Sequence, residues 1–173
     1  MTDGVVLRPG EGRLIAGGAL EGTLKVGKSH TGLLSAFEIV VPPGFDVGAH
    51  KHREAQELFY VLDGELDLLA FEPTTQAAGD WHQWVSGSGR RYLRGGAGSL
   101  LFVPSGCPHA FANPTRKPAR MLFLVAPSGH EDYLEELAQL LQASRGRPDP
   151  ADVAELRRRY DIEQLTPLHA GSG

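Results

Sequence analysis

The sequence predicts a mainly β protein that ends in two short helices. Up to about residue 127, short apolar runs alternate with turns, and the counts of 22 glycines and 12 prolines suit many such turns. Beyond that point the apolar residues recur at helical rather than strand spacing. A chain of 173 residues suits one domain with a sizeable core, and we see no internal repeat.

The N-terminal third supplies the first strands. Within residues 4–30, short strand-like pieces are separated by Gly-rich turns, and we interpret them as outer strands or an arm. Residues 33–41 predict a strong strand. Because alternate side chains of a strand point to opposite faces, Phe37 and Ile39 face inward there and Glu38 faces outward.

Two histidines follow, two positions apart. On a strand, His50 and His52 project from the same face. Residues 53–56 are enough for a tight connection, so residues 57–64 are predicted to return as the next strand, with Glu57 beside the histidines. Two imidazoles and one carboxylate on adjacent strands can hold a divalent metal ion and leave coordination positions open.

A third imidazole comes from a distant part of the chain. Residues 100–103 predict a strand, and a turn rich in proline and glycine follows at 104–108. His109 then begins another short strand. Between the two histidine regions, Leu66 and Leu68 are predicted to point inward, opposite in direction to Asp67.

Residues 72–97 lack clean alternation and predict one irregular hairpin near the mouth of the barrel. Trp81 and Trp84 either form an aromatic wall over the metal or pack on the outside of a sheet. We favour packing, since large aromatic side chains usually serve it. The arginines of this segment (Arg90, Arg91 and Arg94) are predicted to be exposed rather than to meet an anionic substrate.

Together the two histidine regions resemble the cupin superfamily. The first matches the pattern G-x5-H-x-H-x4-E-x6-G at Gly44, His50, His52, Glu57 and Gly64. The second matches G-x5-P-x-G-x2-H-x3-N at Gly98, Pro104, Gly106, His109 and Asn113. The flanking residues 31–44 and 118–137 are similar to single-domain, quercetin-dioxygenase-like cupins. The resemblance implies a double-stranded β-helix, or jelly-roll, barrel.

The resemblance also implies the metal ligands, which are His50, His52, Glu57 and His109. The cofactor is then one divalent transition metal: iron, manganese, nickel, cobalt or zinc. Glu57 is in addition the candidate catalytic base. Strand alternation predicts an apolar substrate pocket, lined by Phe37, Ile39, Phe59, Val61 and Phe111. A cupin that keeps these residues and uses its cavity without metal is the alternative.

Two classes of function fit this site. The first is a metal-dependent dioxygenase that oxidises a small enol or phenolic compound, and the flanking segments favour it. The second is a non-redox role, either a metal-dependent isomerase or lyase, or a small-molecule-binding protein without turnover. Fold resemblance does not separate them, because this fold hosts many functions. The substrate and the native metal stay open.

The C-terminal part is predicted as a helical extension. We divide the chain into a barrel (1–127), an extension packed on it (128–165) and a flexible tail (166–173). A capping box of Ser128 and Glu131 starts a helix over 129–142. This helix has an apolar stripe at Tyr133, Leu134, Leu137, Leu140 and Leu141.

A second helix begins with Asp149 as N-cap and Pro150 at its first position. The triplet Arg157, Arg158 and Arg159 on this helix is predicted to be a solvated face. His130, in the first turn of the preceding helix, is predicted to be exposed.

Composition indicates which binding partners and which cellular compartment to expect. A net charge of −4 favours neither nucleic acid nor an anionic membrane, and no apolar run approaches the roughly 20 residues of a membrane span. The N-terminal residues lack a signal-peptide pattern, and the single cysteine, Cys107, cannot form an intrachain disulfide, so we expect a cytoplasmic protein. Cys107 is interpreted as a small buried residue rather than a ligand or redox group.

We also expect a homodimer. Antiparallel sheets leave edge strands that need covering, and the N-terminal strands can pair across a two-fold axis. Related cupins commonly dimerise in this way.

Overall fold

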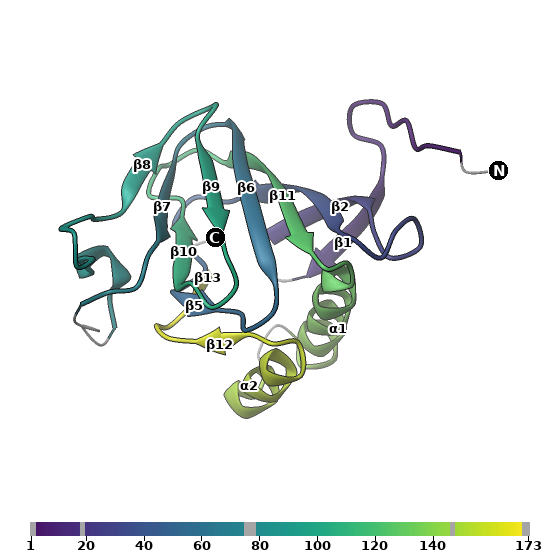
Figure 1. Ribbon diagram of the computed structural model, residues 1–173. Coiled ribbons are helices and arrows are strands. Elements are labelled where there is room, and N and C mark those ends of the chain that lie inside the picture. The colour runs from purple at the N-terminus through teal and green to yellow at the C-terminus, as the bar shows by residue number, and fades with distance from the viewer. Residues whose placement is uncertain (1–2, 18–19, 75–78, 146–147, 171–173) are drawn as a thin grey trace.

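Two antiparallel sheets pack face to face in the computed structural model, which describes residues 3–17, 20–74, 79–145 and 148–170 (Figure 1). The first sheet contains β1 (Arg13–Gly17), β2 (Leu20–Val26), β3 (Ser35–Val41), β6 (Gln56–Asp63), β9 (Leu100–Val103) and β11 (Ala119–Ala126). Its strand order is β1-β2-β3-β11-β6-β9.

The second sheet contains β4 (Phe45–Asp46), β5 (His50–Lys51), β7 (Leu66–Ala70), β8 (Leu93–Gly95), β10 (His109–Ala112), β12 (Glu163–Gln164) and β13 (His169–Ala170). The order β12-β5-β10-β4-β13 continues through β7, which pairs with β10 and β8. The predicted mainly β, jelly-roll class is therefore confirmed, and each predicted barrel strand near the two histidine regions is present.

The core lies between the sheets and is organised by a row of phenylalanines. Phe123 of β11 pairs in register with Phe37 of β3 on one side and with Phe59 of β6 on the other. The ring centroids of Phe59 and Phe123 are 4.8 Å apart and those of Phe37 and Phe123 are 5.6 Å apart. Such cross-strand pairs fix the strand register. Glu38 faces outward as predicted and forms ion pairs with Arg120 and Lys25.

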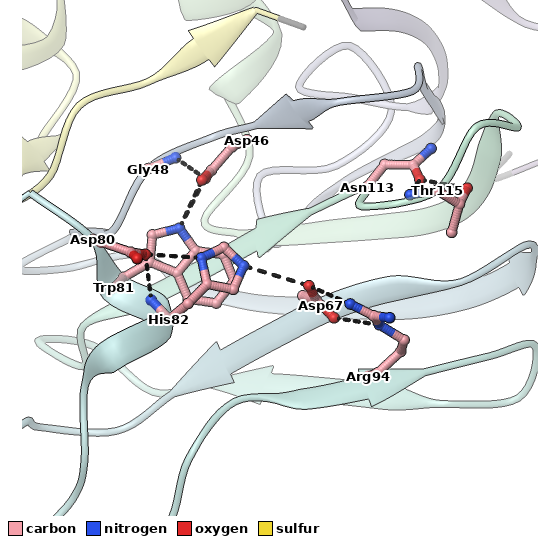
Figure 2. A network of polar contacts seen from close by, with 9 residues as sticks. All are labelled: Asp46, Gly48, Asp67, Asp80, Trp81, His82, Arg94, Asn113 and Thr115. Carbon is pink, nitrogen blue, oxygen red and sulfur yellow. Dashed lines mark hydrogen bonds and ion pairs between the residues drawn. The ribbon is translucent and has the colours of Figure 1, made fainter.

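The turn after β6 explains the glycine at the end of the first motif. Gly64 has a φ of 77°, a left-handed conformation that glycine adopts without steric cost. A Cβ at this position would also lie 2.9 Å from the Cα of Ala119. Asn113, which ends the second motif, donates to the carbonyls of Val41 and Lys117. It also accepts from Thr115 (Figure 2). Both motif ends therefore serve the fold.

Residues 79–92 cover the outer face of the second sheet, as the packing interpretation of the tryptophans predicted. Trp81, in a short 3-10 helix (Trp81–Gln83), and Trp84 are both about 1% exposed and pack on Ala49, Leu69 and Ala110. The indole Nε1 of Trp81 donates to Asp46 at 2.8 Å. The tryptophans are not a wall over the metal site.

Leu66 and Leu68 are buried in the core as predicted, and Asp67 on the opposite face is buried as well. Although it points away from the barrel core, it is 1% exposed because this segment covers it. The Nε and Nη2 atoms of Arg94 bind its two oxygens at 2.8 and 3.1 Å, and His82 lies on its other side (Figure 2). All three arginines are exposed as predicted, and Arg94 in addition pairs with Asp67.

Two helices follow the barrel and lie together at one end of it, beside β12 (Figure 1). They are α1 (His130–Ala143) and α2 (Pro150–Arg159), and Asp149 caps α2 as predicted by accepting from the backbone NH of Ala151. Among the described residues, no helix is both long and apolar enough to cross a membrane.

The predicted capping box at the start of α1 is wrong. The N-cap is Gly129, with no side-chain cap. Glu131 is instead 2% exposed and accepts hydrogen bonds from Ser35 Oγ and from the backbone NH groups of Lys28 and Gly129. Glu131 therefore ties α1 to the loop between β2 and β3, which is a tertiary role that the local pattern did not indicate.

The segment after α2 returns to the barrel. Strands β12 and β13 pair with β5 and β4, and the hydroxyl of buried Thr166 accepts from the NH of Ala49. Within the predicted tail, Thr166 and β13 are thus joined to the second sheet, and the flexibility of the tail stays a prediction. Residues 171–173 lie outside the described part of the chain.

Candidate metal centre

Four buried side chains from both sheets converge at one point. His50 lies on β5 and pairs in register with His109 on β10, while Glu57 comes from β6 of the other sheet. His52 follows β5 directly. The ligand atoms of these four residues all lie within 4.8 Å of one another, and each residue is at most 7% exposed. The structure thus brings together all four predicted ligands in a cluster that can hold one metal ion.

Backbone carbonyls orient the three imidazoles. The Nδ1 atoms of His50, His52 and His109 lie 2.9, 3.0 and 3.1 Å from the carbonyl oxygens of Gly48, Asp161 and Cys107, respectively. A carbonyl oxygen only accepts, so Nδ1 carries the proton in each ring. In the neutral ring the Nε2 lone pair then faces the cluster, as a metal ligand requires.

The atoms that face the cluster centre have no hydrogen-bond partner among the described residues. These atoms are His52 Nε2, His109 Nε2 and Glu57 Oε2. His109 Nε2 is 2.8 Å from Glu57 Oε2 and His52 Nε2 is 3.2 Å from Oε1, but neither contact has hydrogen-bond geometry. Buried polar atoms rarely remain unpartnered. A cation between them would satisfy all three, so the residues fit a divalent metal ion.

Electrostatics set the protonation of the cluster. Burial and the neighbouring His109 lower the pKa of His50 well below its usual value, which keeps this ring neutral. Burial alone would raise the pKa of Glu57, but His109 and His52 outweigh it and hold the pKa well below its ordinary range. Burial lowers the pKa of His52, yet its contact with Glu57 prevails and the pKa is raised. A proton on His52 therefore competes with a metal ion for the same carboxylate.

The cluster opens on a largely apolar cavity of about 270 Å³. Three of the predicted wall residues, Ile39, Phe59 and Phe111, line it. Phe37 and Val61 do not, since they are fully buried in the core between the sheets. Other lining residues come from parts of the chain outside the two histidine motifs. They include Leu20, Tyr133, Leu134, Leu137, Val153 and Ile162. The helices therefore close the cavity rather than only covering a sheet.

His130 lines this cavity, so its predicted exposure is wrong. Its ring lies against Phe123 and Tyr133, each with centroids 5.3 Å away, and its centroid is 6.5 Å from that of His52. Burial is the main cause that lowers its pKa to about 4, so the ring is neutral at pH 7. A helical signal was present, because His130 lies three and four residues before Tyr133 and Leu134 on the predicted apolar stripe.

Arg157 is the second cavity residue that sequence reasoning missed. The predicted solvated face holds only for Arg158 and Arg159, whereas Arg157 is half-buried and lines the cavity. It follows Val153 by four residues and therefore lies on the apolar side of α2.

Cys107 and His82 are not part of the cluster. Cys107 is half-buried against the core, burial raises the pKa of its thiol, and its contribution to the site is the backbone carbonyl that orients His109. His82 packs on Trp81 at the outer face of the second sheet.

The protein is thus a two-sheet β barrel with a buried cluster of three histidines and one glutamate that can hold a metal ion. The family model described as "Cupin domain" matches residues 37–125, and the chain belongs to this family. No curated protein matches the sequence.

Solved structures share the fold at low sequence identity. The cupin domain of Cnp3 from Schizosaccharomyces pombe is 15% identical with a TM-score of 0.50, over 83% of this chain and 80% of that one. KdgF from a Halomonas species is 14% identical with a TM-score of 0.50, over 66% and 85%. A predicted oxalate decarboxylase from Thermotoga maritima is 23% identical with a TM-score of 0.48, over 62% and 80%. These similarities concern the fold alone.

Proposed function

We propose that this protein is a metal-dependent dioxygenase that oxidises a small enol or phenolic compound. One observation carries the proposal: an unpartnered set of three imidazoles and a carboxylate is buried at the wall of an apolar cavity. Such a ligand set leaves up to two positions open on a six-coordinate ion. The cavity volume, about 270 Å³, is near the lower limit for ligand pockets, roughly 300 Å³, and suits a small substrate.

The four cluster residues and the apolar wall would have different roles in this reaction. His50, His52, His109 and Glu57 would hold iron, manganese, nickel, cobalt or zinc. When bound, a redox-active ion supplies Lewis acidity and the electron transfer that dioxygen chemistry needs. Glu57, whose pKa is held well below its ordinary range, is ionised and can accept the hydroxyl proton of an enol or phenol. The apolar wall excludes water and orients the substrate ring.

A non-redox isomerase or lyase is the second candidate. The observation that favours it is the pair formed by ionised Glu57 and neutral His130 in one cavity. Two such groups can remove a proton at one atom and return it at another, with no need for oxygen. A protein that binds the compound without turnover would use the same wall.

The test is to load the protein separately with Fe(II), Mn(II), Ni(II) and Zn(II), and to screen enols and phenols under air and under argon. If the proposal is right, substrate is lost only in air, and oxygen consumption matches the substrate lost. The variant His109→Ala should consume no oxygen. Equal turnover under argon would establish the isomerase or lyase instead. Tight binding with no turnover by any metal form would establish a binding protein.

A further inference from the structure

We propose that Arg157 makes the cavity selective for compounds that carry a carboxylate group. The inference deepens the proposed function, on which it rests for the site at which the substrate binds. It adds a second anchor to the substrate: one end faces the metal cluster and an anionic end meets the guanidinium of α2.

Arg157 is a cation without a carboxylate partner in the described part of the chain. Its Nη1 donates to Gln164 Oε1 at 2.7 Å, and its Nε is buried with no hydrogen-bond partner. The adjacent arginines are different, because Arg158 and Arg159 form surface ion pairs with Glu155 and Glu136. A buried donor without a partner costs free energy, so the guanidinium of this cavity-lining residue is incompletely hydrogen-bonded and an anion that binds it is favoured.

Gln164 places this guanidinium on the metal-bearing side of the cavity. Gln164 pairs in register with His50 between β12 and β5, and both residues line the cavity. Its Nε2 donates to the carbonyls of Val47 and Thr166, at 3.2 and 2.7 Å. The amide is thereby fixed with its oxygen toward Arg157 and holds Nη1, while Nε has no hydrogen-bond acceptor among the described residues.

The charge of the cavity also favours an anion. Among the residues that line it, Arg157 is the one lysine or arginine and Glu57 the one aspartate or glutamate. A bound divalent ion and Arg157 contribute three positive charges and Glu57 one negative charge, so two positive charges are uncompensated. A substrate with an ionised hydroxyl and a carboxylate would neutralise both.

The protein itself shows how such an edge holds a carboxylate. Arg94 binds the two oxygens of Asp67 through Nε and Nη2, at 2.8 and 3.1 Å. Arg157 lines the cavity, and among the described residues its guanidinium has only the Nη1 bond to Gln164 and no carboxylate partner. The substrate class that fits is therefore a small enolic or phenolic carboxylic acid with an apolar body.

Binding to the Zn(II)-loaded protein tests this without turnover. The probes are 4-hydroxybenzoate, 4-hydroxyphenylacetate and 4-hydroxycinnamate, which separate the two ends by increasing lengths, each compared with its methyl ester by titration calorimetry. We expect at least one acid to bind about tenfold or more tightly than its ester, the range for a charge-assisted hydrogen bond. Equal affinities for every pair would overturn the proposal.

Matched variants assign the effect to one residue. Arg157→Gln should abolish the preference for the acid, whereas Arg158→Gln, on the exposed face of the same helix, should retain it. Melting temperatures of both variants verify folding. If the preference survives in folded Arg157→Gln, the carboxylate binds the metal and the inference is wrong. Acid preference without oxygen uptake would refute only the dioxygenase, and oxygen-dependent turnover without acid preference would refute only this inference.

Discussion

Each imidazole of the cluster is fixed by a carbonyl, so each should matter for metal affinity. We expect purified wild-type protein to hold one divalent metal ion per chain, and His52→Ala and His109→Ala to hold at least about tenfold less. His30→Ala is the control, because His30 is outside the cluster and its Nδ1 accepts from Gly27. Elemental analysis provides the measurement. Equal metal content in all four proteins would contradict the assignment.

The same contacts predict a pH dependence of metal binding. Contact with Glu57 raises the pKa of His52 in the metal-free protein, so its proton displaces a metal ion more readily as the pH falls. We expect metal affinity to be retained above the histidine range and to be lost progressively below it. Chelator competition at a series of pH values would show this, and an affinity independent of pH would exclude imidazole ligands.

Glu131 should stabilise the fold at neutral pH and lose this contribution in acid, because its pKa is lowered in the folded state. Burial raises its pKa, but hydrogen bonds from Ser35 and two backbone NH groups outweigh this and hold the pKa below 4.5. Its contribution is therefore present above about pH 4.5 and is lost as the pH falls through the folded-state pKa. We expect Glu131→Gln to lose about 1–3 kcal/mol at pH 7. In denaturant titrations the difference from wild type should shrink toward pH 3, and a constant difference would refute the role of the charge.

At the scale of elements, the segment after α2 links the extension to the metal centre. The carbonyl of Asp161 accepts from His52, and its carboxylate binds the NH of Glu54 and the side chain of Arg53. Asp161 also has a φ of 59°, which aspartate and asparagine tolerate better than most residues. We expect Asp161→Ala to weaken metal binding about tenfold, and Asp161→Asn to weaken it less. Unchanged metal affinity in Asp161→Ala would show that the carbonyl of residue 161 stays in place without the carboxylate contacts to Arg53 and Glu54.

The whole extension should be needed for the fold. Truncation after Pro127 removes α1, α2, β12 and β13, together with Tyr133, which is 7% exposed, and the half-buried leucines of α1. Each leucine would contribute roughly 1.5–3 kcal/mol if fully buried, and less here. We expect a lower melting temperature or no folded product. A truncated protein that melts like the full chain would show that the extension is dispensable.

The sequence predicted strands and ligands better than the cavity. Strand alternation is a local property, so the faces of Glu38, His50 and His52 follow from the chain itself. His130 and Arg157 were missed because a polar residue on an apolar helical stripe points to solvent or to a cavity according to where the helix docks. The burial of Asp67 has a related cause, since His82 and Arg94 from a later segment cover its face. Docking is a tertiary event, and local periodicity does not encode it.

At the scale of the molecule, the predicted homodimer has two candidate surfaces. The first sheet ends in β1, with Leu14 61% exposed, and in β9, with Leu100 56% and Phe102 52% exposed. Exposed edges of this kind favour pairing with another chain. We expect light scattering to give a dimer at tens of micromolar, and Leu14→Lys to disrupt it. Disruption by Phe102→Lys alone would move the interface to β9, and a wild-type monomer would contradict the dimer.

The candidate ligands and several of the other cavity residues come from different parts of the chain. The family domain, residues 37–125, contains every candidate ligand, whereas His130, Arg157 and Gln164 lie beyond it. Natural variation in the residues beyond the domain can therefore change which compounds the cavity binds while the four candidate ligands stay unchanged. A chimera that keeps the barrel and Asp161, which orients His52, and receives another protein's cavity-lining helices should retain the candidate metal site and bind different compounds.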